Sequence, residues 1–288
     1  MENLNYFIDA VMTYPFLQNA LIAGVLVGIV CGVVGCFIIL RGMALMGEAI
    51  SHAVLPGVVI AYMLGASFFV GAVITGVLTA LGIGYISQNS RIKDDSAIGI
   101  LLTGTFAVGV VLVTTIGSTS INVWHILFGN VLAVSRTDLW MTLGITVGVL
   151  ILIFVFYKQL LLSTFDPTMA KAIGLPTRLI HYMLMFILSL VTVASLNTVG
   201  IILVVAMLIT PGATAYLMTD RLPMMLTLSA VFGVISAVVG VYYSYIYDVA
   251  TGASIVIVAT LLFTLAFLFS PKQGVFVRWF RRMTTSKA

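Results

Sequence analysis

The stretch "LQNALIAGVLVGIVCGVVGCFIIL", residues 17–40, is a run of 24 residues without a single charge. About 20 apolar residues in a helix are enough to cross the hydrocarbon core of a bilayer. The apolar residues are continuous, whereas a strand of a membrane β-barrel alternates between apolar and polar positions. Because a helix satisfies all its backbone groups within one segment in lipid, the run predicts a transmembrane helix.

The composition of the whole chain agrees with this span. Of the 288 residues, 61% are hydrophobic and only 8% are charged, whereas about 25% are charged in a typical soluble domain. We therefore predict an all-α, polytopic integral membrane protein. The net charge of +4 comes from short loops and the tail, so it does not indicate nucleic-acid binding. Residues 1–16 lack Lys and Arg, so no cleavable signal peptide is expected.

The apolar runs predict about nine spans. The stretch 179–219 is too long for one helix, and we divide it near "SLNTVG", residues 195–200. Eight spans result if residues 198–219 form only a half-span. Segment 117–138 is mixed and predicts a loop with a short helix. The nine predicted spans lie near residues 17–40, 43–64, 68–88, 97–116, 139–157, 179–195, 200–219, 224–246 and 252–270.

The distribution of positive charge favours nine spans with the N-terminus outside and the C-terminus in the cytoplasm. This topology puts 12 of the 13 Lys and Arg residues on the cytoplasmic side, and only Arg136 outside. Cytoplasmic loops of membrane proteins collect such residues, and an eight-span topology puts Arg221 and the loops on conflicting sides. The chain then forms a single transmembrane domain, residues 1–288, with a cytoplasmic loop at 158–178 and a basic cytoplasmic tail at 271–288.

One predicted span contains ionisable residues, in "ALMGEAISHAVLPG", residues 44–57. Glu48 and His52 are four residues apart, so they share one face of a helix. An ionisable group at bilayer depth costs at least about 2.5–3.5 kcal/mol and marks a functional site by default. A carboxylate and an imidazole at this spacing form half of a site for a divalent transition metal, which a second copy in a symmetric dimer completes. The alternative is that Glu48 snorkels at the cytoplasmic end or pairs with His52 or Arg41.

Two neighbours could shape the same pathway. Ser51 lies beside the pair, and Pro56 follows on the same segment and interrupts its helical hydrogen bonds. Pro56 is either an ordinary membrane kink or a bend that turns the ligand-bearing helix toward the pathway.

The cytoplasmic loop contains "FDPTMAKAIGLPTR", residues 165–178. Asp166 and Pro167 are typical of a helix start, and Gly174 is typical of a stop. The pattern predicts a short helix with small residues such as Ala170. It is suited either to docking into a partner's groove or to acting as an amphipathic connector.

The other candidates favour structural roles. Cys31 and Cys36 have no CxxC spacing and are expected to be buried. The glycines at helical spacing in the first span predict close helix packing: Gly24, Gly28, Gly32 and Gly35. His125, in the external segment, is more typical of an interfacial belt than of metal contact, and His181 is expected to have no ligand role.

Catalytic motifs are missing from the sequence. No Lys is followed by Ser or Thr, so the chain has no Walker A motif and any ATP must be hydrolysed by another subunit. The sequence also lacks H-E-x-x-H, a Ser-His-Asp arrangement and a Rossmann glycine pattern. An enzyme is therefore not expected, and neither is a permanently bound cofactor.

The sequence resembles the membrane permease subunit of bacterial ATP-binding-cassette importers for manganese, zinc and iron, and most of all the manganese branch of Gram-positive bacteria. The resemblance covers nearly the whole chain. It rests on "LRGMALMGEAISHAVLPG" (40–57), "HILFGNVLAV" (125–134), "FDPTMAKAIGLP" (165–176) and "VGIILVVAMLITPGATAYL" (199–217).

The resemblance implies a multi-pass protein of the bacterial plasma membrane, with four kinds of partner. These are a second copy of the chain, two cytoplasmic ATP-binding subunits, an extracellular metal-binding lipoprotein and membrane lipid. It implies that Glu48 and His52 meet the transported ion, although the family usually has Asp in place of Glu48. It places the ATPase-coupling helix at Asp166–Gly174, with Ala170 and Gly174 at the small-residue positions.

The expected function is therefore uptake of a divalent transition metal, driven by ATP that a partner hydrolyses. Mixed oxygen and nitrogen ligands suit Mn²⁺ and also admit Zn²⁺ and Fe²⁺. The alternatives are a Zn²⁺ or Fe²⁺ importer of the same family, an ion-coupled secondary cation transporter in which Glu48 is a relay, and a structural membrane protein. The coupling-helix pattern argues against the last two.

Overall fold

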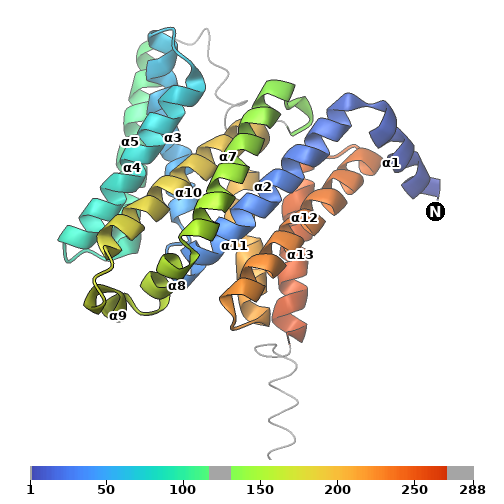
Figure 1. Ribbon diagram of the computed structural model, residues 1–288. Coiled ribbons are helices and arrows are strands. Elements are labelled where there is room, and N and C mark those ends of the chain that lie inside the picture. Colours follow the sequence, from blue (N-terminus) through green and yellow to red (C-terminus); the bar gives the residue numbers. More distant parts are fainter. Residues whose placement is uncertain (1, 117–130, 271–288) are drawn as a thin grey trace, which may run out of the picture.

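The structure is a computed structural model that describes residues 2–116 and 131–270 (Figure 1). This part of the chain is helical and contains no β-strand. The helices are α1 (Glu2–Thr13), α2 (Pro15–Leu40), α3 (Met46–Met63), α4 (Phe68–Asn89), α5 (Asp94–Ile116), the 3₁₀ turn η1 (Val131–Ala133), α7 (Arg136–Val155), α8 (Tyr157–Phe165), α9 (Pro167–Ala172), α10 (Thr177–Val199), α11 (Ile201–Met218), α12 (Leu222–Tyr247) and α13 (Thr251–Phe269).

Nine helices of the described residues are long and apolar enough to cross a membrane: α2, α3, α4, α5, α7, α10, α11, α12 and α13. The predicted nine spans are confirmed. The long apolar stretch divides at Gly200, which separates α10 from α11. Its backbone angles, φ 82° and ψ 166°, lie in a region that is essentially open to glycine alone.

The spans form two packed groups that α10 joins. Helices α3, α4 and α5 pack on one another, while α2 packs on α11 and α12, and α13 packs on α11 and α12. Helix α10 contacts α4 and α3 of the first group and α2 of the second. The short helices α8 and α9 lie together at one end of the bundle, here called the α9 end (Figure 1).

Small residues hold α2 against its neighbours, as the glycine spacing predicts. A Cβ on Gly28 would lie 2.8 Å from the Gly233 carbonyl carbon of α12, and one on Gly32 would lie 2.9 Å from Ser229. Gly24 faces Ala237, and Gly35 faces the Leu208 backbone of α11. Since a side chain at Gly28, Gly32 or Gly35 would overlap the neighbouring helix, the backbones approach closely there.

Two short helices have no counterpart among the predicted spans, because short amphipathic helices lack continuous apolar runs. Helix α1 buries Phe7 against α12, where its ring meets that of Tyr242 edge to face at 5.2 Å. Helix α8 occupies the first part of the predicted cytoplasmic loop at 158–178, and it buries Leu160 completely. His125 and the tail 271–288 lie outside the described residues.

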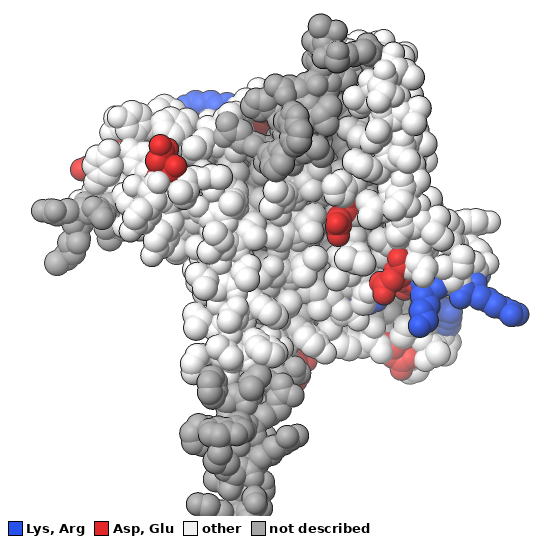
Figure 2. All heavy atoms as spheres, turned by 180° about the vertical axis from the view of Figure 1, so that it is seen from behind, with Lys and Arg blue, Asp and Glu red and all other residues white. Residues whose placement is uncertain are grey.

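The surface is largely uncharged. Figure 2 shows a largely uncharged surface, with most charged groups near the two ends of the molecule and an acidic side chain between them. Large apolar side chains are exposed on several spans, among them Leu78, Val111, Phe154 and Leu261. Such a surface is stable in lipid rather than in water, so the protein is a multi-pass membrane protein.

Candidate metal-pathway site

Glu48 and His52 come together in one groove. Glu48 lies in the first turn of α3 and His52 one turn later, both half-buried. They line a groove of about 540 Å³ whose other wall is one face of α11. The α11 residues that line it are Ile201, Ile202, Val205, Ala206, Ile209 and Thr210. The spacing of four residues therefore places both ionisable groups on the same face, as predicted.

The contact of α3 with α11 sets the depth of the pair. Gly47, next to Glu48, packs on α11, where a Cβ added to it would lie 2.7 Å from Leu208 Cδ1. Leu208 is near the middle of α11, which spans Ile201–Met218. Glu48 thus lies beside the middle of α11, a membrane-spanning helix.

The groove offers two metal ligands in apolar surroundings. A carboxylate oxygen and an imidazole nitrogen both bind divalent transition metals, which need at least four ligands. The described residues contain no group of three or more His, Cys, Asp or Glu side chains that could hold a metal ion. Among the described residues, one copy of the chain thus brings two candidate ligands, Glu48 and His52, to this groove.

An aromatic ring holds the His52 imidazole. Phe106 of α5 meets it edge to face, with ring centroids 5.4 Å apart and planes at 80°. This contact, like the α11 wall of the groove, joins residues far apart in the chain. The sequence carries no local signal for either one.

Ser51 and Pro56 contact neighbouring backbone and helices rather than the groove. Ser51 is buried and its hydroxyl donates a 2.8 Å hydrogen bond to the Gly47 carbonyl. Pro56 packs on α5, where a Cβ on Gly109 would lie 3.0 Å from Pro56 Cδ. Helix α3 continues through Pro56 to Met63. Because proline lacks an N–H, the His52 carbonyl loses its helical donor.

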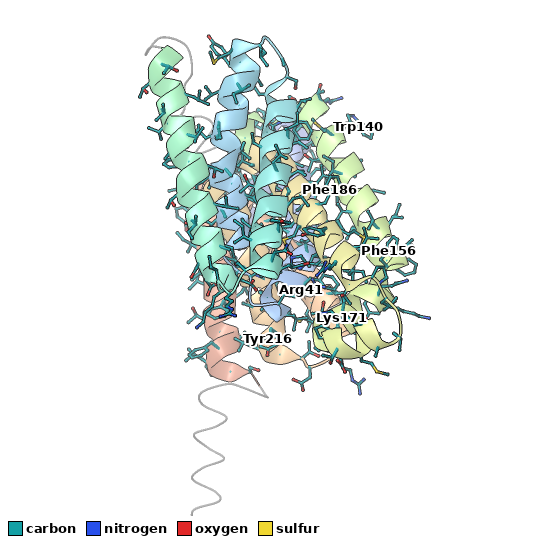
Figure 3. The ribbon with its side chains drawn as sticks, turned by 90° about the vertical axis from the view of Figure 1, so that its left-hand side faces the viewer. Arg41, Trp140, Phe156, Lys171, Phe186 and Tyr216 are labelled. Carbon is teal, nitrogen blue, oxygen red and sulfur yellow. The ribbon has the colours of Figure 1, made fainter. Side chains whose placement is uncertain are left out.

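Arg41 is engaged away from Glu48. Its Nη2 donates to Ser163 Oγ at 2.9 Å, its Nε donates to Thr164 Oγ1 at 3.2 Å, and its Nη1 lies 3.4 Å from His181 Nδ1. Figure 3 shows Arg41 near the α9 end, with Lys171 beside it and Trp140 toward the other end. Pairing of Glu48 with Arg41, one of the alternatives above, is thus not what the structure contains. Glu48 and His52 are not hydrogen-bonded to each other either, among the described side chains.

The short helix predicted after Phe165 is α9. The Asp166 side chain accepts a 2.8 Å hydrogen bond from the Met169 N–H and a 2.6 Å one from the Thr168 hydroxyl. These two bonds lower the pKa of the Asp166 carboxyl, because they stabilise its charged form. At the other end Gly174, with φ 82°, donates to the Lys171 carbonyl and Leu175 donates to the Ala170 carbonyl, which is a Schellman stop.

The exposed face of α9 is mixed, because Thr168 and Lys171 are exposed together with apolar side chains. Ala170 is fully buried, whereas Met169 and Ile173 are 52% and 56% exposed. A partner that approaches α9 from outside would meet these two side chains together with Lys171. Ala170 instead packs toward the rest of the chain.

The two cysteines and His181 lie where structural roles would place them. Cys31 and Cys36 are free and buried, and Cys31 Sγ lies 3.6 Å from Ser195 Oγ. His181 is half-buried beside Arg41, far along the chain from the groove and not among the residues that line it.

Comparison with known proteins places the chain in a family. Residues 13–270 match the ABC 3 transport family. The chain is 71% identical to the manganese transport system membrane protein MntC of Halalkalibacterium halodurans, over 98% of this chain and 96% of that protein. It is 49% identical to the manganese import system permease protein ScaB of Streptococcus gordonii, over 93% of this chain and 96% of that protein.

A solved structure shares the fold. The structure of PsaBC from Streptococcus pneumoniae in complex with Fab superimposes with a TM-score of 0.84 at 50% identity, and the match covers 94% of this chain and 97% of that chain. Together with the nine spans and the family match over most of the sequence, this shows that the chain is a member of the ABC 3 transport family.

Proposed function

We propose that this protein is the membrane permease of an ATP-binding-cassette importer that takes up Mn²⁺, and that Glu48 and His52 bind the ion as it crosses. The observation that carries the proposal is the groove in which both side chains face α11, a membrane-spanning helix. The similarity to manganese transport proteins supports Mn²⁺ as the substrate.

One chain brings only two candidate ligands to the groove, and this supports a dimer in which a second copy adds two more. A two-fold axis near the groove would bring two carboxylates and two imidazoles around one ion, which gives four ligands. Carboxylate oxygen suits Mn²⁺, and imidazole suits Fe²⁺ and Zn²⁺. This mixed set binds Mn²⁺ without the thiolates that would favour softer ions, and an ion in transit must be held weakly enough to leave.

Helix α9 is the proposed contact for the ATPase. The cap at Asp166 and the stop at Gly174 hold it as a rigid unit at the α9 end, which we assign to the cytoplasm on the distribution of Lys and Arg. Its exposed Met169 and Ile173 would enter a groove of the ATP-binding subunit. Ala170 would act from the inner side, where its small side chain allows α9 to pack closely against the bundle.

The other partners follow from the same function. Two ATP-binding subunits would contact the two α9 helices of a dimer, and a metal-binding lipoprotein would deliver the ion on the opposite face. With this topology the N-terminus is outside and the C-terminus is cytoplasmic. The described chain would form one permease domain, and the residues at 158–178 would form its coupling loop.

Two other functions make different predictions. A Zn²⁺ or Fe²⁺ importer would have the same architecture but another order of metal preference. A secondary transporter with Glu48 as an ion relay would work without an ATPase and would respond to ionophores. The α9 unit favours the ATP-driven mechanism, because a secondary transporter has no use for a docking helix of this kind.

The test is uptake of ⁵⁴Mn²⁺ into proteoliposomes that hold the permease, its ATP-binding subunit and its lipoprotein. Uptake is expected to need ATP, to survive an ionophore, and to be competed more strongly by unlabelled Mn²⁺ than by Zn²⁺ or Fe²⁺. Uptake without ATP that an ionophore abolishes would refute the ATP-driven function. Stronger competition by Zn²⁺ or Fe²⁺ would refute Mn²⁺ as the substrate.

A further inference from the structure

Arg41 joins three segments that are far apart in the sequence. Its side chain extends from the end of α2 and reaches Ser163 and Thr164 of α8 and His181 of α10. Ser163 is 8% exposed, and Arg41 and His181 are half-buried. Burial lowers the pKa of the Arg41 guanidinium, but arginine stays charged at physiological pH. Hydrogen bonds from charged donors are stronger than those between neutral groups. We call this set of Arg41 hydrogen bonds the Arg41 joint.

The partners of Arg41 lie on both sides of α9 along the chain. Thr164 lies two residues before the Asp166 cap, and His181 lies in the first turns of α10, soon after α9 ends. Because both flanks of α9 are bonded to one guanidinium, a shift of α9 that carries Thr164 with it would move Arg41 or break these bonds. A cavity of about 570 Å³ lies beside the joint, and Arg41, Pro167, Lys171 and His181 are among the residues that line it.

Arg41 is also close in sequence to α3, the helix that contains Glu48 and His52. A compact turn connects it to α3, in which Met43 N–H donates to the Ile38 carbonyl and Met46 N–H donates to the Met43 carbonyl. Met43 is 4% exposed. Since this turn is hydrogen-bonded and buried, a displacement of Arg41 reaches the first turn of α3, which contains Glu48.

His181 extends the joint to α4. Its Nδ1 faces Arg41 and accepts, so the ring proton is on Nε2. Nε2 is buried without a hydrogen-bond partner, and a Cβ on Gly84 of α4 would lie 3.2 Å from it. The imidazole is therefore wedged between the guanidinium and the α4 backbone. A shift of Arg41 would press on α4, which packs against α3.

We infer that Arg41 is a positioning residue that carries the movement of α9 to α3, and so couples ATP hydrolysis to the Glu48 and His52 site. This inference rests on the proposed function. The joint requires arginine, because its planar fork bonds several acceptors at fixed angles, whereas a lysine ammonium is a single point charge. Arg41 does not touch the ion, so its loss should change coupling rather than metal binding.

The test measures the number of Mn²⁺ ions taken up per ATP hydrolysed, in proteoliposomes that hold the whole complex. Arg41→Lys is expected to lower this ratio about tenfold, since one charge-assisted hydrogen bond is worth at least about a factor of ten. The double variant Ser163→Ala with Thr164→Val leaves Arg41 in place and is expected to lower the ratio as well. Arg91→Lys, an exposed arginine in the turn before α5, is the matched control.

Assembly with the ATP-binding subunit and Mn²⁺ affinity at equilibrium are measured on the same samples, and both should stay at wild-type values. A wild-type ratio in both Arg41→Lys and the double variant would overturn the inference. So would a double variant that no longer assembles, because the joint would then have only a structural role. A wild-type complex that takes up no ⁵⁴Mn²⁺ would instead refute the proposed function. This outcome is seen in the wild-type control and does not depend on the variants.

Discussion

The Ser229 hydroxyl of α12 donates a 2.7 Å hydrogen bond to the Gly32 carbonyl of α2. One turn away on the same face of α2, Gly28 meets Gly233 of α12 backbone to backbone. A glycine at this crossing lets the two helices approach closely, and this allows an interhelical hydrogen bond to a main-chain carbonyl. Helix α2 also packs on α11, which forms one wall of the groove. The contact of α2 with α12 therefore helps to hold that wall in place.

Gly28→Val should therefore destabilise the protein strongly. The added carbon atoms would overlap Gly233, and overpacking of this kind costs on the order of 3 kcal/mol. The measurement is the thermal stability of detergent-solubilised protein, followed by size-exclusion chromatography. Gly148→Val is the control, because no atom lies within 4 Å of a Cβ at Gly148. Equal melting temperatures for the two variants would contradict the packing described for α2 and α12.

Gly200→Ala should disturb the junction of α10 and α11. The backbone there, with φ 82° and ψ 166°, is strained for any residue with a Cβ, at a cost of about 1–3 kcal/mol. Because Ile201 and Ile202 of the groove follow immediately, we expect a lower melting temperature together with slower ⁵⁴Mn²⁺ uptake. Gly99→Ala, at an open position in α5, should change neither. Wild-type stability of Gly200→Ala would rule out this backbone conformation.

The Asp166 cap should make the stability of α9 independent of pH near neutrality. Hydrogen bonds from Met169 N–H and the Thr168 hydroxyl lower the pKa of its carboxyl below the ordinary value of about 3.9. The stabilisation is therefore complete above that ordinary value and is lost only as pH falls through the lower pKa of the folded state. Protection of α9 amides from hydrogen exchange should not change between pH 7.5 and 5.5.

Substitutions at Asp166 separate the cap from its charge. Asp166→Asn keeps an acceptor for the Met169 N–H and should keep most of the protection, whereas Asp166→Ala should lose it across α9. The readout is hydrogen exchange of the peptide that contains residues 167–172, with a peptide from α5 as internal reference. Faster exchange at pH 5.5 than expected from the intrinsic rate would contradict this assignment of the pKa.

Glu48→Asp should keep transport but change metal preference. The ligand atom stays a carboxylate oxygen, but the side chain is shorter by one methylene, so the oxygen moves relative to His52. We expect ⁵⁴Mn²⁺ uptake within about tenfold of wild type, or ~1.4 kcal/mol. Competition by Zn²⁺ and Fe²⁺ should change more than the uptake itself. A Glu48→Asp variant as inactive as Glu48→Gln would show that carboxylate chemistry alone does not explain this position.

The sequence alone was sufficient for the number of spans and for the pair on α3. Continuous apolar runs and the spacing of Glu48 and His52 are local signals, and they predicted nine helices and a shared face. The split near residues 195–200 was predicted from length alone, and the structure gives its physical cause as the backbone angles of Gly200.

Other parts of the site depend on contacts between distant segments, which local patterns do not encode. The wall that α11 contributes opposite Glu48, the Phe106 ring against His52 and the three partners of Arg41 are all of this kind. The orientation of α9 is another case. Its small residues suited either docking or a connector, and tertiary packing buries Ala170 while Ala172 and Gly174 stay exposed.

The central claim is that Glu48 and His52 bind the ion in transit, and uptake of ⁵⁴Mn²⁺ by Glu48→Gln and His52→Ala tests it most directly. Changes behind a metal ligand already cost 10–100-fold, so loss of a ligand should lower uptake by at least about 100-fold at equal membrane expression. Thr103→Val, at an exposed position on α5 whose hydroxyl bonds only its own helix, should retain wild-type uptake. Wild-type uptake by both site variants would contradict the account.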